Sequence, residues 1–134
     1  MTTVPDLKPH MDAVTAALLS VGLTVGQGGA PDPKPTNQRY AALYFDPGTV
    51  QRESLADART DFEVTFQVTC VGPTAEQCLW VAQKVRVALF PRLAVAGRAT
   101  WRAEDLGGPP VQRDDEVSPP LHFLPVQYRL KSTA

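Results

Sequence analysis

The chain has 134 residues, of which 43% are hydrophobic, and its formal net charge is −1 at pH 7. This length suits one globular domain with its own core, so we expect a single domain over residues 1–134. The balanced charge disfavours a dedicated nucleic-acid-binding protein, which would show a clustered basic face. No apolar run approaches the roughly 18–20 residues that span a bilayer, and the first residues, MTTVPDLKPH, show no signal-peptide core. We therefore expect a soluble, cytosolic protein without a membrane partner.

The first half of the chain predicts one helix and two strands. Residues 7–21 carry apolar side chains three and four positions apart, which indicates an amphipathic helix with Asp6 as its N-cap. Residues 23–25 predict a short strand, and the proline-rich segment 26–38 predicts an exposed connector. Residues 39–45 predict a second strand, which the turn at residues 46–48 ends. The polar residues 49–60 then predict a long hairpin loop.

The second half of the chain predicts one helix between strands. Residues 62–71 alternate apolar and polar side chains, which is typical of a strand with one buried face. Residues 75–89 predict a helix, because Thr74 and Gln77 form a capping box before an apolar stripe. Residues 98–104 predict a strand, and residues 106–120 predict a second long irregular loop. Residues 122–130 predict the last strand, in which Pro125 favours an edge position.

This order of elements predicts an α+β fold. We expect a two-layer sandwich with a mostly antiparallel sheet of four to five strands, two helices packed on one face, and a long hairpin loop. Cys70 and Cys78 both lie on predicted apolar faces, so we expect reduced thiols that act as small hydrophobic side chains.

Candidate catalytic and metal-binding residues form no known constellation. His10 lies in the first turn of a predicted surface helix and His122 starts the last strand, and neither has a second metal ligand at helical or hairpin spacing. The glycines at 26, 28 and 29 precede prolines instead of the helix that a phosphate-binding loop requires. No serine has the G-x-S-x-G setting of a nucleophile elbow. The sequence therefore predicts no enzyme activity, no metal and no cofactor.

Two long polar loops are the features most open to a functional interpretation. Loops of roughly 12–15 residues without regular structure are uncommon in compact domains and are often functional. Charges of both signs suit contacts between subunits, although ordinary solvated loops are the alternative. The hairpin-loop candidates are Arg52, Glu53, Asp57, Arg59 and Asp61, and the later-loop candidates are Arg113, Asp114, Asp115 and Glu116.

Several segments together resemble a known family. The N-terminal amphipathic helix is followed by YAALY at residues 40–44, FEVTFQVTCVG at 62–72, TAEQCLWVA at 74–82 and VQYRL at 126–130. Over residues 5–132 the chain resembles the tail-terminator, or tail-completion, proteins of long-tailed bacteriophages (siphophages), particularly those of phages of actinobacteria. The resemblance implies a hexameric ring that caps the tail tube, stops polymerisation of the tube protein and presents the surface to which neck proteins attach.

The resemblance also implies a location and partners. The protein would assemble in the host cytoplasm and reside at the head–tail interface of the virion, in contact with the tube protein and a neck or head-completion protein. DNA would pass through the ring without specific binding. Asp114, Asp115 and Glu116 would either face the lumen and repel DNA phosphates or contact a neighbouring subunit. The alternatives are a head-completion or neck adaptor protein of the connector and a small ligand-binding domain or enzyme.

Overall fold

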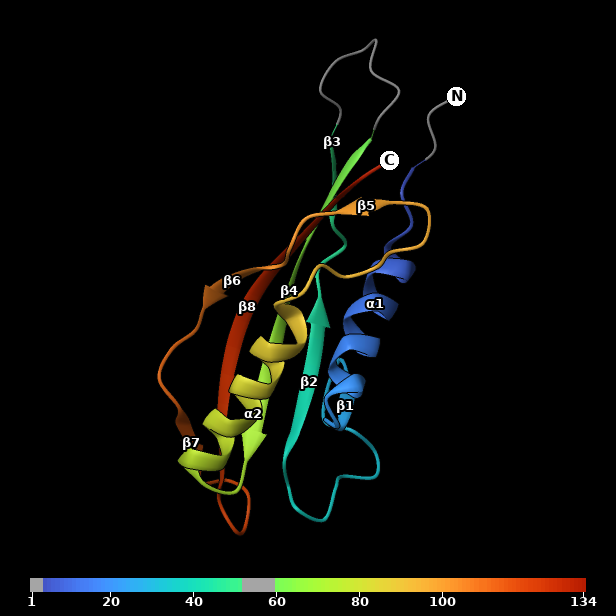
Figure 1. The fold of residues 1–134 in the computed structure, drawn as a ribbon. Coiled ribbons are helices and arrows are strands. Elements are labelled where there is room, and N and C mark those ends of the chain that lie inside the picture. The colour runs from blue at the N-terminus through green and yellow to red at the C-terminus, as the bar shows by residue number, and fades with distance from the viewer. Residues whose placement is uncertain (1–3, 52–59) are drawn as a thin grey trace.

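The computed structural model describes residues 4–51 and 60–134, and its two helices lie on the same face of one sheet (Figure 1). This arrangement confirms the predicted α+β two-layer sandwich. In chain order the elements are α1 (Leu7–Ser20), β1 (Val25–Gln27), β2 (Tyr40–Phe45), β3 (Thr49–Gln51), β4 (Asp61–Gly72), α2 (Ala75–Leu89), β5 (Ala99–Thr100), β6 (Glu104–Gly107), β7 (Gln112–Asp114) and β8 (Leu121–Thr133).

The sheet is built around the long antiparallel pair β4 and β8. Their register runs from Phe62 opposite Ser132 to Gly72 opposite His122. On the far edge of β4 lie β2 and β3, and β1 pairs with β2 in parallel. On the far edge of β8 lie β5, β6 and β7 in succession. The eight strands thus form five rows, namely β1, β2 with β3, β4, β8, and β5 to β7.

The core lies between the sheet and the helices. Strand β4 alternates buried and half-buried residues along its length, as the sequence pattern predicts. The buried side chains of the strands pack against the apolar faces of both helices and form one core, out of contact with water. Its central members are Val64, Phe66 and Val68 of β4, Val14 and Leu18 of α1, and Val81 and Val85 of α2.

Local signals place the helix ends where the sequence predicts them, to within a residue. The Thr74 hydroxyl accepts a hydrogen bond from the Gln77 backbone N–H at 3.1 Å and caps the start of α2. Helix α1 ends at Ser20, and Gly22 follows with a φ of +84°, a conformation that favours glycine.

Both cysteines are buried free thiols, as predicted. The Cys78 thiol donates to the Cys70 carbonyl at 3.2 Å across the contact between α2 and β4. Burial raises the pKa of Cys70 to about 12 and that of Cys78 to about 11, so both remain protonated at neutral pH.

Several predicted strand boundaries are wrong. The short first strand covers Val25–Gln27 instead of residues 23–25. The predicted strand 98–104 is divided between β5 and β6, and β3 occupies the start of the predicted hairpin loop. The predicted irregular loop 106–120 contains β7, so Arg113 and Asp114 lie in a strand. These short segments have strand geometry because they pair with a long neighbour, which local sequence does not reveal.

The edge position predicted from Pro125 is also wrong, because β8 has neighbours on both sides. The outer row is interrupted opposite Pro125, since β6 ends at the Gly107–Gln127 pair and β7 pairs Gln112 with Phe123. Gly108 crosses this interruption so closely that an added Cβ would collide with the Pro125 carbonyl oxygen. The proline therefore lies where the ladder is already broken on one side.

His10 is fully buried, contrary to its predicted place on a surface helix. Its Nδ1 lies 2.8 Å from the Asp6 carbonyl oxygen, so this nitrogen carries the proton. Its Nε2 lies 2.7 Å from the Ser132 hydroxyl, which also accepts a hydrogen bond from Arg98 Nε at 2.8 Å. Burial lowers the pKa of His10, so the neutral ring accepts the Ser132 proton and ties α1 to the end of β8.

Candidate functional site

The face of the sheet opposite the helices carries an ordered polar surface. Thr65, Gln67 and Thr69 of β4 alternate with the core residues and are half-buried. The Gln127 side chain donates to Gln67 Oε1 at 2.8 Å, and the Gln67 side chain donates to the Thr69 hydroxyl at 2.9 Å. These bonds fix long polar side chains in one arrangement, which leaves a flat, preorganised surface.

A row of ion pairs continues this open face toward the start of β4. Arg129 Nε lies 2.9 Å from Glu63 Oε1, and Arg129 Nη1 lies 3.4 Å from Glu104 Oε2. Lys131 Nζ lies 3.6 Å from Glu104 Oε1. The row joins β4, β8 and β6, and its charges are mutually compensated.

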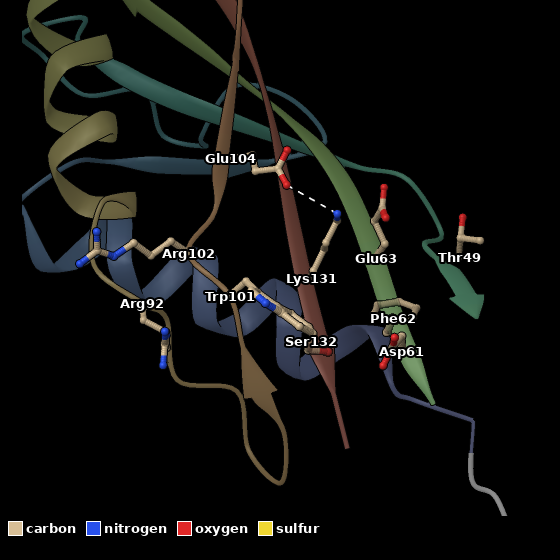
Figure 2. A pocket seen from close by; sticks show the side chains of 10 residues that line it. All are labelled: Thr49, Asp61, Phe62, Glu63, Arg92, Trp101, Arg102, Glu104, Lys131 and Ser132. Carbon is tan, nitrogen blue, oxygen red and sulfur yellow. Dashed lines mark ion pairs between the residues drawn. The ribbon is translucent and has the colours of Figure 1, made fainter. Parts of the chain in front are cut away.

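A hollow of about 710 Å³ lies beside the ion-pair row. Figure 2 shows Trp101 lying over β8 next to Ser132, with Arg92 and Arg102 on one side and Glu63 on the other. The volume falls in the range of small-molecule sites, roughly 300–1,000 Å³. Its lining mixes both charges, and one lining hydroxyl, that of Ser132, contacts the His10 ring. The lining residues are Thr49, Asp61, Phe62, Glu63, Arg92, Trp101, Arg102, Glu104, Lys131 and Ser132.

Arginines and exposed aromatic rings lie together at one side of the hollow, where Trp101 and Arg102 line it and Phe90 adjoins it through Arg102. Trp101 is 50% exposed, and Phe90, which follows α2, is 66% exposed. The Arg102 guanidinium carbon lies 5.0 Å from the centroid of the Phe90 ring, within cation–π range. The backbone N–H of Trp101 donates to the Lys131 carbonyl and holds this segment against β8. Tryptophan and arginine are the residues most enriched in the energetic centres of protein interfaces.

Sequence reasoning missed this surface. Trp101 lies within the predicted strand 98–104 and Phe90 directly follows the predicted helix 75–89, and neither is among the predicted site residues. The sequence does contain one sign of this surface, because an arginine follows closely after each aromatic residue: Arg92 after Phe90, and Arg102 after Trp101.

The hairpin-loop candidates are only partly described. Arg52, Glu53, Asp57 and Arg59 lie outside the described residues. Asp61 begins β4, pairs in register with Gln51 of β3, and lines the hollow. The described base of the hairpin therefore lines the same hollow as Trp101.

The later-loop candidates lie at the other end of β8. Arg113 and Asp114 belong to β7, while Asp115 and Glu116 form the turn that follows. Arg113 Nε lies 2.5 Å from Asp115 Oδ1, and Asp114 Oδ1 accepts the Glu116 backbone N–H at 3.1 Å. Because Arg113 pairs with His122 while Phe62 pairs with Ser132, the two predicted sets are separated by about ten strand residues, or roughly 30 Å.

The described residues hold no metal centre of the usual kind. Within residues 4–51 and 60–134, no three or more His, Cys, Asp or Glu side chains are placed to hold a metal ion. Ser132 also lines the hollow, but its residue is fully buried and its hydroxyl is bonded to His10 and Arg98. In the same part of the chain, no helix has the length and apolar character needed to cross a membrane.

Comparison with solved structures identifies chains of the same fold. One, from the virion of a native gene transfer agent (GTA) particle, has a TM-score of 0.65 and 17% identity, with 92% of this chain and 93% of that chain covered. A second has a TM-score of 0.60 and 17% identity, with 96% of each chain covered. No protein-family model and no curated protein matches the sequence. At this identity the likeness establishes a shared fold over nearly the whole chain.

Proposed function

We propose that this chain is a structural protein of a phage or phage-like virion, with an architectural and not a catalytic role. The observation that carries the proposal is the fold shared, over 92% of the chain, with a chain of a gene transfer agent virion. The sequence segments that resemble phage tail-terminator proteins support the same assignment. On this proposal residues 1–134 act as one domain.

The specific role proposed is that of a tail terminator. Six copies form a ring that caps the tail tube, stops addition of tube protein and presents a surface for a neck protein. The preorganised open face and the exposed surface around Trp101 support this role, since both suit burial against other protein surfaces. The protein acts first in the host cytoplasm and then at the head–tail interface, and DNA passes through the ring without specific binding.

A head-completion or neck adaptor protein is the second candidate. The same structural match supports it, because the matched chain is described only as part of a virion and not as part of its tail or its neck. The sequence resemblance favours the tail role over the neck role.

Negative-stain imaging of the purified protein, alone and mixed with tubes of the tube protein from the same genome, tests the assignment. Sixfold rings seated on one end of each tube support the tail-terminator role. Rings that bind capsid portals and leave tubes bare support the neck adaptor instead. A monomer that binds neither contradicts both roles.

A further inference from the structure

We call the surface of Phe90, Arg92, Trp101 and Arg102 the arginine–aromatic patch, and it combines exposed aromatic rings with positive charge. We propose that it binds the acidic turn of a second copy, formed by Asp114, Asp115 and Glu116. This inference rests on the proposed ring and names the contact that joins its subunits.

The patch has the composition of an interface centre. Its two aromatic rings are at least half exposed, and Arg102 is already stacked over Phe90. Three acids line the adjoining hollow, and each acts on another cation: Glu63 pairs with Arg129, and Glu104 pairs with Arg129 and Lys131. The charge of Asp61 acts on the Arg98 guanidinium. The patch therefore offers cationic and apolar contacts together.

The acidic turn is a rigid counterpart. Asp114 caps the backbone of the turn through its contact with the Glu116 N–H, and Asp115 pairs with Arg113. These contacts hold the turn in one arrangement, which lowers the entropy cost of docking. Three acids against one arginine leave the turn negatively charged, so it complements the patch.

The two surfaces of one molecule do not meet. The Trp101 N–H bonds to the Lys131 carbonyl at one end of β8, whereas Arg113 pairs with His122 near the other end. Nine residues of extended strand separate these points, or roughly 30 Å. The complementary surfaces consequently pair only between copies.

A contact between two different surfaces has a structural consequence. Each copy presents one patch and one turn, so the contact is heterologous and repeats from subunit to subunit. Such a contact closes into a ring when the rotation per subunit divides a full turn, and it otherwise extends into a filament. The closed form is the ring of the proposed function.

Charge reversal tests the pairing, with native mass spectrometry and light scattering as readouts. We expect R92E/R102E and D115K/E116K each to weaken self-association at least tenfold. Mixed in equal amounts, the two variants regain assembly, because the reversed patch of one meets the reversed turn of the other. The mixed rings alternate the two variants, which native mass spectrometry detects as equal subunit numbers.

A control variant separates this effect from charge reversal at an unrelated exposed site, and recovery in the mixture separates it from a change of net charge. K8E/D12K reverses an exposed ion pair on α1 and preserves both the pair and the net charge, so it should assemble like the wild type. Circular dichroism and the Tm of each variant establish that it is folded. W101A, which keeps the charge, should also weaken assembly.

Several outcomes overturn the inference. Assembly that survives either charge reversal, failure of the mixture to recover, or a monomeric wild-type protein at millimolar concentration each contradicts it. Failure of the proposed function is distinguishable. Assemblies that obey the charge-reversal pattern but never cap tubes refute the tail role alone, whereas rings that cap tubes despite both reversals refute the contact alone.

Discussion

The two faces of the β4–β8 pair are ordered by different forces. On the helix-covered face, Val64, Phe66 and Val68 are almost completely buried, and the hydrophobic effect dominates. On the open face, Thr65 and Gln67 of the same strand are half-buried, and side-chain hydrogen bonds and ion pairs fix their neighbours. One strand thus supplies stability with alternate residues and a preorganised contact surface with the rest.

The largest expected effect comes from the covered face. Phe66→Ala removes a ring that stacks on Tyr128 at 5.6 Å and packs 5.3 Å from Phe45. We expect the free energy of unfolding to fall by about 3–5 kcal/mol, measured by urea denaturation. The matched control is Thr65→Ala on the open face, with an expected change of about 0.5 kcal/mol. Equal losses from the two variants would contradict the contrast between the faces.

A pH dependence is expected where the covered layer meets the end of β8. The pKa of His10 is lowered by burial from its usual 6.5, so below pH 6.5 the unfolded chain takes up a proton that the folded protein does not. Stability is therefore greatest above pH 6.5 and falls as the pH is lowered. His10→Gln removes this contribution, which thermal unfolding between pH 4.5 and 7.5 would detect. An unchanged slope in that variant would show that His10 does not titrate in this way.

A smaller effect is expected from the ion-pair row of the open face. Arg129→Gln removes the cation that contacts Glu63 and Glu104. Because these side chains are about one-third to one-half exposed, we expect a loss of only about 0.5–1 kcal/mol. The loss should shrink in 1 M salt, since exposed charges are screened. A loss above that of Phe66→Ala would reverse the proposed ranking of the two faces.

An effect no larger than that of the ion-pair row is expected from the hydrogen bond between Gln67 and Gln127. A double-mutant cycle on Gln67 and Gln127, with each residue changed to alanine, isolates the energy of their shared hydrogen bond. We expect a coupling of about 0.5–1 kcal/mol by urea denaturation. Zero coupling would mean that this bond does not order the open face.

The sequence predicts the covered layer well because its signals are local. Hydrophobic periodicity and the Thr74 cap determine the helices, and the alternation along β4 determines its buried face. The sequence also contained the evidence for a buried His10, because His10 lies four residues before Val14 and eight before Leu18 on the same helical stripe. Histidine is a polar residue, and this polarity instead favoured a surface position for His10 in the sequence analysis.

The outer row and the arginine–aromatic patch were not predictable in the same way. All four residues of β6 are exposed, and β5 has only two residues, so neither has a buried period of its own. They are strands because β8 provides hydrogen-bonding partners far along the chain. Charge alone identifies Asp114 and Glu116 as candidates in the sequence. Their distance from the hollow follows from the pairing of β7 with β8, which the sequence does not reveal.

The most direct test of the tail-terminator role is to follow growing tail tubes by electron microscopy after the purified protein is added. We expect elongation to stop and each tube to carry one sixfold ring at a single end. Tubes that keep elongating with bare ends, while the added protein remains monomeric, would contradict it.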